Sequence, residues 1–298
     1  MAAPLGELLT AMVTPFQSDG AVNFASARRL AHHLIESGSD GIVICGTTGE
    51  GPTVSDREKL DLMDAIADEV GASACIVANT GTYDTHHSVA LTRAALETGA
   101  DAFLAVTPYY NKPPRAGIIA HFSAIAEAAE GHPVIIYNIP QRVVVNLEPD
   151  LLAEIGRIPN VAAVKQATAD LDQARRILAD TGLALYAGND DLLCPFLEMG
   201  GKGGVCVASH VAGTQMRRMI DLARSGDMDA ARAEDDVLHD LYTALAVTTN
   251  PIPVKAALNL LGHDVGGLRL PLVEADAAQT ATVAAALEAA GIHPAARV

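Results

Sequence analysis

The chain alternates between short apolar runs and longer stretches in which apolar residues recur at helical spacing. Most of the short runs are apolar at nearly every position and rich in β-branched residues, which is typical of strands covered on both faces of a parallel sheet. We therefore expect eight parallel strands. The runs are LLTAMVTPF (8–16), GIVICG (41–46), ACIVAN (74–79), AFLAVTP (102–108), PVIIYNI (133–139), VAAVKQ (161–166), LALYAGN (183–189) and GGVCVAS (203–209).

Three of the intervening stretches carry clear helix signals. Residues 25–38 place their large apolar residues on one stripe. Residues 55–71 begin with Ser55 and have Glu58 three positions later, which is the pattern of a capping box, and residues 84–99 begin with an Asp or Thr cap. Both of these stretches end at a glycine, a common helix terminator. The sequence thus repeats a strand–helix unit.

The number of these units predicts the fold. Eight of them are complete by about residue 225, and eight such units close into an α/β barrel of the (β/α)8 or TIM type. We expect the barrel over residues 1–225 and a helical segment packed on it over residues 226–298, where only helical patterns remain. A doubly wound sheet is the alternative, but the turn after the first strand, TPFQSDG (14–20), lacks the glycine-rich phosphate loop of that fold.

Charge and hydropathy argue against several classes of protein. Lys and Arg number 20 against 36 Asp and Glu in 298 residues, a net charge of −16, which argues against nucleic acid and against a basic membrane-binding patch. Half of the residues are hydrophobic, enough for a large core, yet no run approaches the length of a membrane-spanning helix. The N-terminal stretch, which carries Glu7, lacks the basic region of a secretory signal.

The cysteines and histidines predict no metal site. No C-x-x-C pair and no H-x-x-x-H pattern is present, so neither a zinc knuckle nor a redox motif is expected. Most of the cysteines lie in apolar runs, which predicts buried, reduced thiols and a cytoplasmic protein. The four are Cys45, Cys75, Cys194 and Cys206.

Unusual polar residues follow the expected strands, at the end where barrel enzymes carry their chemistry. Because these strand ends meet at one face of the barrel, we expect one site there. The segments are GTTGEG (46–51), TPYYNKPP (107–114), YNIPQR (137–142), GNDD (188–191) and SH (209–210). We interpret His210 as a packed or solvated residue and the acidic run 234–236 as a solvated helix face. Glu50 alone offers too few carboxylates for glycosidase chemistry.

Lys165 is the most informative single residue, because it lies inside an apolar run. Burying a charged ammonium is costly, so such a position favours the neutral amine. A neutral amine attacks carbonyl carbon and forms Schiff bases. The alternative is a structural lysine that pairs with a carboxylate or extends to the rim of the barrel.

The neighbouring loops offer groups suited to a small carboxylate substrate. The turn with Thr47 and Thr48 presents hydroxyls and backbone N–H groups that can hold an anion. Tyr110 and Tyr137 can pass protons when hydrogen-bonded in a chain, and Arg142 can grip a carboxylate through two parallel bonds. Each group also has a purely structural interpretation. The threonine turn can be an ordinary turn, the two tyrosines can pack in the core or at an interface, and Arg142 can be a surface arginine.

Taken together, these motifs resemble the family of 4-hydroxy-tetrahydrodipicolinate synthases, also called dihydrodipicolinate synthases. The resemblance extends from AMVTPF (11–16) to LRLP (268–271), and its markers are GTTGE (46–50), VTPYYNKP (106–113), YNIPQR (137–142), VKQAT (164–168) and NPIPVK (250–255). Related pyruvate lyases, such as N-acetylneuraminate lyase, share the YNIP turn and the lysine. They typically lack Thr48 and an arginine at position 142, so these two residues favour the synthase.

The resemblance implies a chemical role for each residue that moves protons. It implies that Lys165 forms an imine with pyruvate, without a metal or another cofactor. Tyr137, Thr48 and Tyr110 are implied to form a proton relay. In the family the tyrosine of the Tyr110 position reaches in from a neighbouring subunit, so the resemblance implies a homo-oligomer, which we expect to be a tetramer.

The remaining implied roles concern substrate binding. Thr47 and Thr48 are implied to hold the pyruvate carboxylate, and Arg142 the carboxylate of L-aspartate 4-semialdehyde. Gly188 and Asn189 are implied to receive the amino end of the semialdehyde. The implied reaction condenses the two substrates into 4-hydroxy-tetrahydrodipicolinate, on the route to diaminopimelate and lysine.

Some positions depart from the family pattern. Residues 143–144 are two valines where the family has a small residue and glycine, Gln166 replaces an acid, and Asn189 replaces an aspartate. The last two changes remove negative charge near the expected pocket. They leave open another pyruvate-dependent aldolase that acts on a sugar acid or a different aldehyde. A non-catalytic pyruvate-binding barrel is the alternative outside this class, and the intact relay argues against it.

A further departure concerns feedback by lysine. Many family members bind lysine in a cleft at the dimer interface near the position of Tyr109, through a histidine, an asparagine and a glutamate. At the matching positions this chain has Lys59, Tyr83 and His87, with Gly51 and Asp56 beside them. These changes remove an acidic acceptor and add a like charge, so we expect weak inhibition or none. Asp56 and Asp84 offer a partial replacement.

Overall fold

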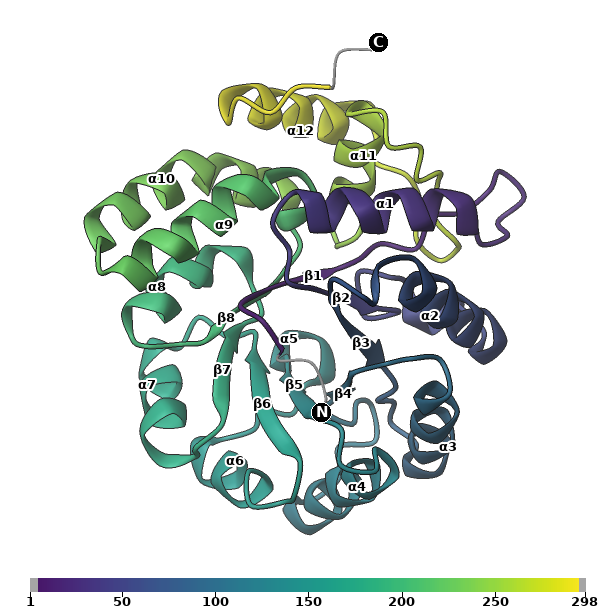
Figure 1. The fold of residues 1–298 in the computed structure, drawn as a ribbon, viewed down its shortest axis with the longest axis vertical. Coiled ribbons are helices and arrows are strands. Elements are labelled where there is room, and N and C mark those ends of the chain that lie inside the picture. The colour runs from purple at the N-terminus through teal and green to yellow at the C-terminus, as the bar shows by residue number, and fades with distance from the viewer. Residues whose placement is uncertain (1–4, 295–298) are drawn as a thin grey trace.

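The computed structural model describes residues 5–294 and shows a closed barrel of eight parallel strands surrounded by helices (Figure 1). Each strand pairs with its neighbours in sequence, and the eighth closes onto the first. The (β/α)8 fold expected from the sequence is confirmed. Residues 1–4, at the start of the expected barrel segment 1–225, lie outside the described residues. The same holds for residues 295–298, at the end of the expected helical segment 226–298.

Strands and helices alternate as far as α9, except that two helices, α5 and α6, lie between β5 and β6. The strands are β1 Leu8–Ala11, β2 Gly41–Ile44, β3 Cys75–Asn79, β4 Ala102–Val106, β5 Val134–Asn138, β6 Val161–Gln166, β7 Ala184–Ala187 and β8 Gly203–Cys206. The helices are α1 Phe24–Glu36, α2 Asp56–Val70, α3 Thr85–Leu96, α4 Arg115–Ala128, α5 Pro140–Val143, α6 Pro149–Ile155, α7 Leu171–Asp180, α8 Leu193–Glu198, α9 Ser209–Ser225, α10 Met228–Leu245, α11 Ile252–Leu260 and α12 Ala277–Ala289. Short 3-10 turns, η1 Gly51–Thr53 and η2 Asp190–Leu192, follow β2 and β7.

Strand side chains alternate between the barrel interior and the layer under the helices. The interior is filled by residues such as Leu9, Val43, Val77, Leu104, Ile135 and Val205. The outer layer packs residues such as Leu8, Ile42, Ile76, Phe103, Ile136 and Leu185 against the helices. Apart from Ala162 in β6 and a few partly buried strand ends, both faces of the strands are therefore buried, which explains why the apolar runs show no alternation in the sequence.

The helix signals read from the sequence are confirmed. Ser55 caps α2 and completes the capping box with Glu58, and Asp84 caps α3 through the N–H groups of His86 and His87. The segment after residue 225 is helical as expected: α10 packs against α9, and α12 packs against α10 and α11. In Figure 1, α11 and α12 lie at the outer edge of the molecule, beyond the barrel. This segment also returns toward the barrel, as the site below shows.

None of the helices in the described part of the chain is long and apolar enough to cross a membrane. Within residues 5–294, no group of three or more His, Cys, Asp or Glu side chains is placed to hold a metal ion. The four cysteines are free and buried. Burial raises the pKa of the Cys45 and Cys75 thiols to about 12, which keeps them protonated and unreactive at neutral pH.

Candidate active site

A cavity of about 730 Å³ opens at the carboxyl ends of the strands. Its walls come from the loops after β2, β5 and β7, from β6, and from the end of α10 with the loop that follows it. It brings together all but one of the site residues expected from the sequence, the exception being Tyr110. Those that line it are Thr47, Thr48, Tyr137, Arg142, Lys165, Gly188 and Asn189.

Lys165 and Tyr137 form the floor of this cavity. They are register partners on β6 and β5, and their residues are 5% and 4% exposed. Lys165 Nζ lies 4.3 Å from the centroid of the Tyr137 ring, within the range of a cation–π contact. Among residues 5–294, Lys165 forms no ion pair with a carboxylate. The interpretation as a paired structural lysine therefore loses its support, and the amine stays available to a ligand in the cavity.

Thr47 and Thr48 lie in a tight turn after β2. Cys45 and Glu50, on either side of the turn, both adopt left-handed backbone conformations, with φ of 58° and 53°. The Glu50 N–H donates to the Thr47 carbonyl at 3.1 Å, which closes the turn. The buried Thr48 hydroxyl accepts a hydrogen bond from Asn250 Nδ2 at 2.8 Å. The turn is thus held in a fixed shape with both threonines on the cavity wall.

Arg142 lies on the short helix α5, which begins at Pro140 directly after the Tyr137 strand. The residue is exposed, and it lines the same cavity as Lys165. Its Nη2 donates one long hydrogen bond, 3.5 Å, to the carbonyl of Asn250. A guanidinium has five N–H donors, so most of them remain free for a carboxylate ligand. Val144 follows with φ of 70°, in the left-handed region that favours glycine, the residue that the family resemblance implies there.

The loop after β7 also lines the cavity, through Gly188–Asp191. A Cβ on Gly188 would lie 2.8 Å from Ala167 Cβ, so a residue without a side chain lets this loop approach the end of β6. Asp190 accepts hydrogen bonds from the Val207 N–H at 2.8 Å and from the Ala208 N–H at 2.9 Å. Burial raises the pKa of Asp190 despite these two bonds. The carboxylate ties the loops after β7 and β8 to each other.

Tyr110 does not reach the cavity of its own chain. It lies in the segment after β4, with φ of 69°, and is 91% exposed. Tyr109, its neighbour, instead packs edge-on against Tyr83 with ring centroids 5.1 Å apart. The exposed phenol is compatible with a role in a neighbouring subunit, which stays a prediction.

A second cavity of about 470 Å³ shares Thr47, Tyr137 and Arg142 with the first. The positions compared above with the family's lysine cleft are on its wall: Lys59, Tyr83, Asp84, His87 and Tyr109. Asp56 lies next to it and pairs with Lys59 Nζ at 3.1 Å and with His87 Nε2 at 2.6 Å. Burial raises the pKa of Asp56, but these two hydrogen bonds outweigh it and the pKa is lowered. The carboxylate is therefore already engaged by two basic side chains.

Gln166 does not line either cavity, contrary to its expected influence on the pocket. It is fully buried, and its carbonyl accepts from Asn138 Nδ2 at 3.0 Å. Its amide donates to Thr168 Oγ1 and to Gln173 Oε1, both at 2.9 Å. Because successive strand residues face opposite sides, the neighbour of Lys165 points into the outer layer. The expected influence of Gln166 on the charge of the pocket is therefore wrong, whereas Asn189 does line the cavity and its influence there stays a prediction.

Two other polar positions are resolved by packing. His210 is fully buried and accepts a hydrogen bond from the Val13 N–H at 3.1 Å, so it is packed, as one of the two interpretations held. The acidic run 234–236 is not uniformly solvated. Asp235 is half-buried, and burial raises its pKa to about 6, whereas Asp236 is exposed. The interpretation of a fully solvated face is wrong at Asp235.

The sequence did not reveal what the chain after α9 contributes to the cavity. His239, Tyr242 and Asn250 line it from α10 and the loop beyond. NPIPVK marked the resemblance, but nothing local indicated that its first residue contacts Thr48, which lies 202 positions earlier. An asparagine directly before a helix and next to a proline is a common loop feature. Only the folded chain reveals this partner.

Comparisons with known proteins agree with this geometry. The profile of the Dihydrodipicolinate synthetase family matches residues 4–290. The 4-hydroxy-tetrahydrodipicolinate synthase of Cyanothece sp. is 49% identical over 275 residues, 92% of this chain and 94% of that protein. The crystal structure of DHDPS from Cyanidioschyzon merolae with lysine bound has a TM-score of 0.94 at 41% identity, covering 96% of this chain and 98% of that one. The chloride-inhibited dihydrodipicolinate synthase from Acinetobacter baumannii complexed with pyruvate has a TM-score of 0.94 at 36% identity, covering 97% and 100%.

Proposed function

The chain belongs to the dihydrodipicolinate synthetase family, and we propose that it condenses pyruvate with L-aspartate 4-semialdehyde to give 4-hydroxy-tetrahydrodipicolinate. The observation that carries this proposal is the buried Lys165 amine beside Tyr137, in a cavity that Arg142 also lines. This arrangement offers a nucleophile, a proton carrier and a carboxylate anchor in one cavity. The product feeds diaminopimelate and lysine biosynthesis.

The proposed first half-reaction takes place on Lys165. The neutral amine attacks the carbonyl carbon of pyruvate, and loss of water gives an imine. The protonated imine withdraws electrons, so a C3 proton leaves and an enamine forms. Tyr137 and Thr48 move protons in these steps, and the turn with Thr47 and Thr48 holds the pyruvate carboxylate. The lysine itself provides the electron sink, so the proposal includes no metal and no other cofactor.

The second half-reaction joins the two substrates. The enamine carbon attacks the aldehyde carbon of the semialdehyde, whose oxygen takes a proton. The amino group of the semialdehyde then attacks the imine carbon, which releases Lys165 and closes the ring. In this scheme Arg142 binds the carboxylate of the semialdehyde, and Gly188 and Asn189 accept its amino end.

The proposal also covers the oligomeric state, the domain organisation and the cellular location of the enzyme. We propose a homotetramer in which Tyr110, exposed in the single chain, completes the relay of a neighbouring subunit. The helical segment 226–298 is part of the proposed catalytic unit, packed on the barrel of residues 1–225. A cytoplasmic location is proposed because the four buried cysteines are all free.

Trapping with borohydride tests the chemistry. The protein is incubated with pyruvate and borohydride, digested, and the peptides are weighed, with Lys165→Ala as the control. A mass gain on the Lys165 peptide is expected. Its absence would contradict the whole aldolase class and favour a non-catalytic barrel.

A coupled assay tests the second substrate. Condensation is measured with a reductase that consumes the product, against a panel of aldehydes and together with the cleavage of N-acetylneuraminate. A clear preference for aspartate semialdehyde is expected. A preference for a sugar acid would replace the synthase by another pyruvate-dependent aldolase, for which Asn189 would be the first residue to examine.

A further inference from the structure

Asn250 contacts both polar walls of the main cavity. Its Nδ2 donates to Thr48 Oγ1 at 2.8 Å, and its backbone carbonyl accepts the 3.5 Å bond from Arg142 Nη2. The residue lies in the loop between α10 and α11, far in sequence from both partners. One residue of the C-terminal segment therefore contacts a member of the proposed relay and the proposed carboxylate anchor.

The direction of the bond to Thr48 has a chemical consequence. An amide NH₂ group only donates, so it occupies a lone pair of the Thr48 oxygen and leaves the hydroxyl proton free. A hydroxyl rotates to suit its partners, and a fixed donor on one side restricts where the O–H points. Among residues 5–294, Thr48 Oγ1 accepts this bond and donates to no side chain. The proton is thus available to a group in the cavity.

The other half of the Asn250 amide supports the same picture. Its Oδ1 is buried and has no hydrogen-bond partner in the described part of the chain. Leaving a buried carbonyl oxygen without a hydrogen bond costs free energy. The Asn250 side chain is therefore held in this orientation by its surroundings and not by a hydrogen bond to Oδ1. The structure around Asn250 is held by helix α11, which begins at Ile252. Lys255 on this helix pairs with Glu50 of the threonine turn at 2.6 Å.

We propose that Asn250 is a positioning residue that orients the Thr48 hydroxyl so that it donates its proton into the cavity. The inference rests on the proposed function, because it assigns Asn250 to the relay that serves the imine on Lys165. The Glu50–Lys255 pair keeps the donor and the turn at a constant separation. The C-terminal segment therefore takes part in proton transfer, in addition to covering the barrel.

The experiment follows the exchange of the pyruvate C3 protons with deuterium, by NMR, without the second substrate. Asn250→Ala is expected to slow this exchange roughly 10- to 100-fold, the scale of a misplaced catalytic group. Asn250→Asp keeps the shape but cannot donate, so it is expected to slow exchange at least as much while the protein stays folded. Both variants are compared in the Thr48→Val background, where the hydroxyl is gone.

Comparing the effect of Asn250 variants in the unaltered enzyme and in the Thr48→Val enzyme decides whether Asn250 acts through Thr48. If Asn250 acts through Thr48, its replacement changes the Thr48→Val enzyme less than about threefold, because coupled residues are not additive. Losses that multiply in full would overturn the proposal and show that Asn250 acts independently. An Asn250→Ala enzyme that exchanges at the normal rate would overturn it as well.

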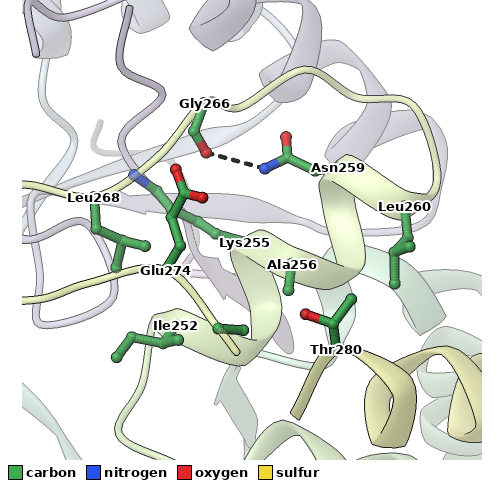
Figure 2. A pocket seen from close by; sticks show the side chains of 10 residues that line it. Ile252, Lys255, Ala256, Asn259, Leu260, Gly266, Leu268, Glu274 and Thr280 are labelled. Atoms are coloured by element: carbon green, nitrogen blue, oxygen red, sulfur yellow. Dashed lines mark hydrogen bonds between the residues drawn. The ribbon is translucent and has the colours of Figure 1, made fainter. Parts of the chain in front are cut away.

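Asn259 supplies a matched control on the same segment. It lies on α11, where its Nδ2 donates to the Gly266 carbonyl at 3.0 Å beside a separate cavity of about 290 Å³ (Figure 2). Asn259→Ala is expected to lower stability and to leave exchange unchanged. Equal slowing by Asn259→Ala would show a general loosening of the segment and overturn the proposal. No exchange in the unaltered protein would instead refute the proposed function itself.

Discussion

Lys255 Nζ lies 2.6 Å from Glu50 Oε1, and both side chains are 1% exposed. The lysine also donates to the Gly267 carbonyl at 2.7 Å and lies 4.2 Å from the centroid of the Phe16 ring. The other oxygen of Glu50 accepts from the Arg269 N–H at 3.0 Å. A buried ion pair with its remaining atoms hydrogen-bonded therefore joins the threonine turn to the C-terminal segment.

Removing one partner of this pair leaves an uncompensated buried charge. Lys255→Met is expected to cost about 3–5 kcal/mol of unfolding free energy, measured by urea denaturation. The double variant Lys255→Met with Glu50→Gln removes both charges and is expected to lose less. Equal losses for the single and double variants would show that packing around Lys255, and not the stranded charge, sets the stability.

The fold was predictable because its signal is local and repeated. Eight apolar runs and their helical intervals reveal the barrel, and a capping residue such as Ser55 is recognised by its neighbour Glu58 three positions on. The main groups of the site were predictable for the same reason, since they follow strands, and strand ends meet on one face. Lys165 was conspicuous because a lysine is costly inside an apolar run.

The rest was not predictable, because it depends on pairs distant in sequence. Asn250 gains its meaning from Thr48, and Lys255 from Glu50, more than 200 positions away in each case. The orientation of Gln166 depends on strand register, which sequence composition does not fix. The place of Tyr110 depends on a second subunit, which a single sequence does not describe.

Arg142→Ala is expected to weaken use of aspartate semialdehyde far more than formation of the pyruvate adduct. The guanidinium faces the cavity with most of its donors free, and losing a charged hydrogen bond costs roughly 10- to 100-fold in KM for the semialdehyde. Borohydride trapping of pyruvate is expected to be unchanged. Arg115→Ala is the matched control, because Arg115 pairs with Asp150 and Glu154 on the outer helices. A similar loss in trapping would move Arg142 to the pyruvate site.

Tyr110 is expected to act in a neighbouring subunit, which complementation tests directly. Tyr110→Phe and Lys165→Ala are each expected to be nearly inactive alone. When co-expressed, mixed oligomers pair an intact Lys165 site with a Tyr110 from the other chain, so part of the activity returns. Sedimentation of the same samples determines the oligomeric state, expected to be a tetramer. No recovery in mixed oligomers, or an active monomer, would contradict the shared relay.

The protein is expected to lose stability as the pH falls from about 6.5 to about 4. Burial lowers the pKa of His121, His210 and His263 from 6.5 to about 4, so the unfolded chain binds more protons over this range. In His210 both ring nitrogens are engaged, and protonation would displace the bond from the Val13 N–H. Urea midpoints across this range measure the effect.

A single variant tests the origin of this acid sensitivity. His121 Nε2 is buried without a hydrogen-bond partner among the described residues, and its Nδ1 contacts only Thr85 Oγ1. His121→Phe keeps the packing and removes one titrating group, so a shallower fall in stability with decreasing pH is expected. An unchanged fall would assign the sensitivity to His210, His263 or the carboxylates.

Feedback by lysine is expected to be weak or absent. A lysine ligand needs an acidic acceptor for its ammonium, but Asp56 beside the second cavity is already paired with Lys59 and His87, and Asp84 caps α3. Lys59, which adds a like charge, and His87, which stands where the family has a glutamate, are each expected to cost on the order of 1–3 kcal/mol of ligand binding free energy, tenfold or more in affinity. Initial rates against L-lysine at saturating pyruvate measure the effect. His87→Glu with Lys59→His frees Asp56 and adds a carboxylate, so inhibition is expected to increase in this variant. Strong inhibition of the unaltered enzyme at submillimolar lysine would show that the aspartates accept the ligand despite their present partners.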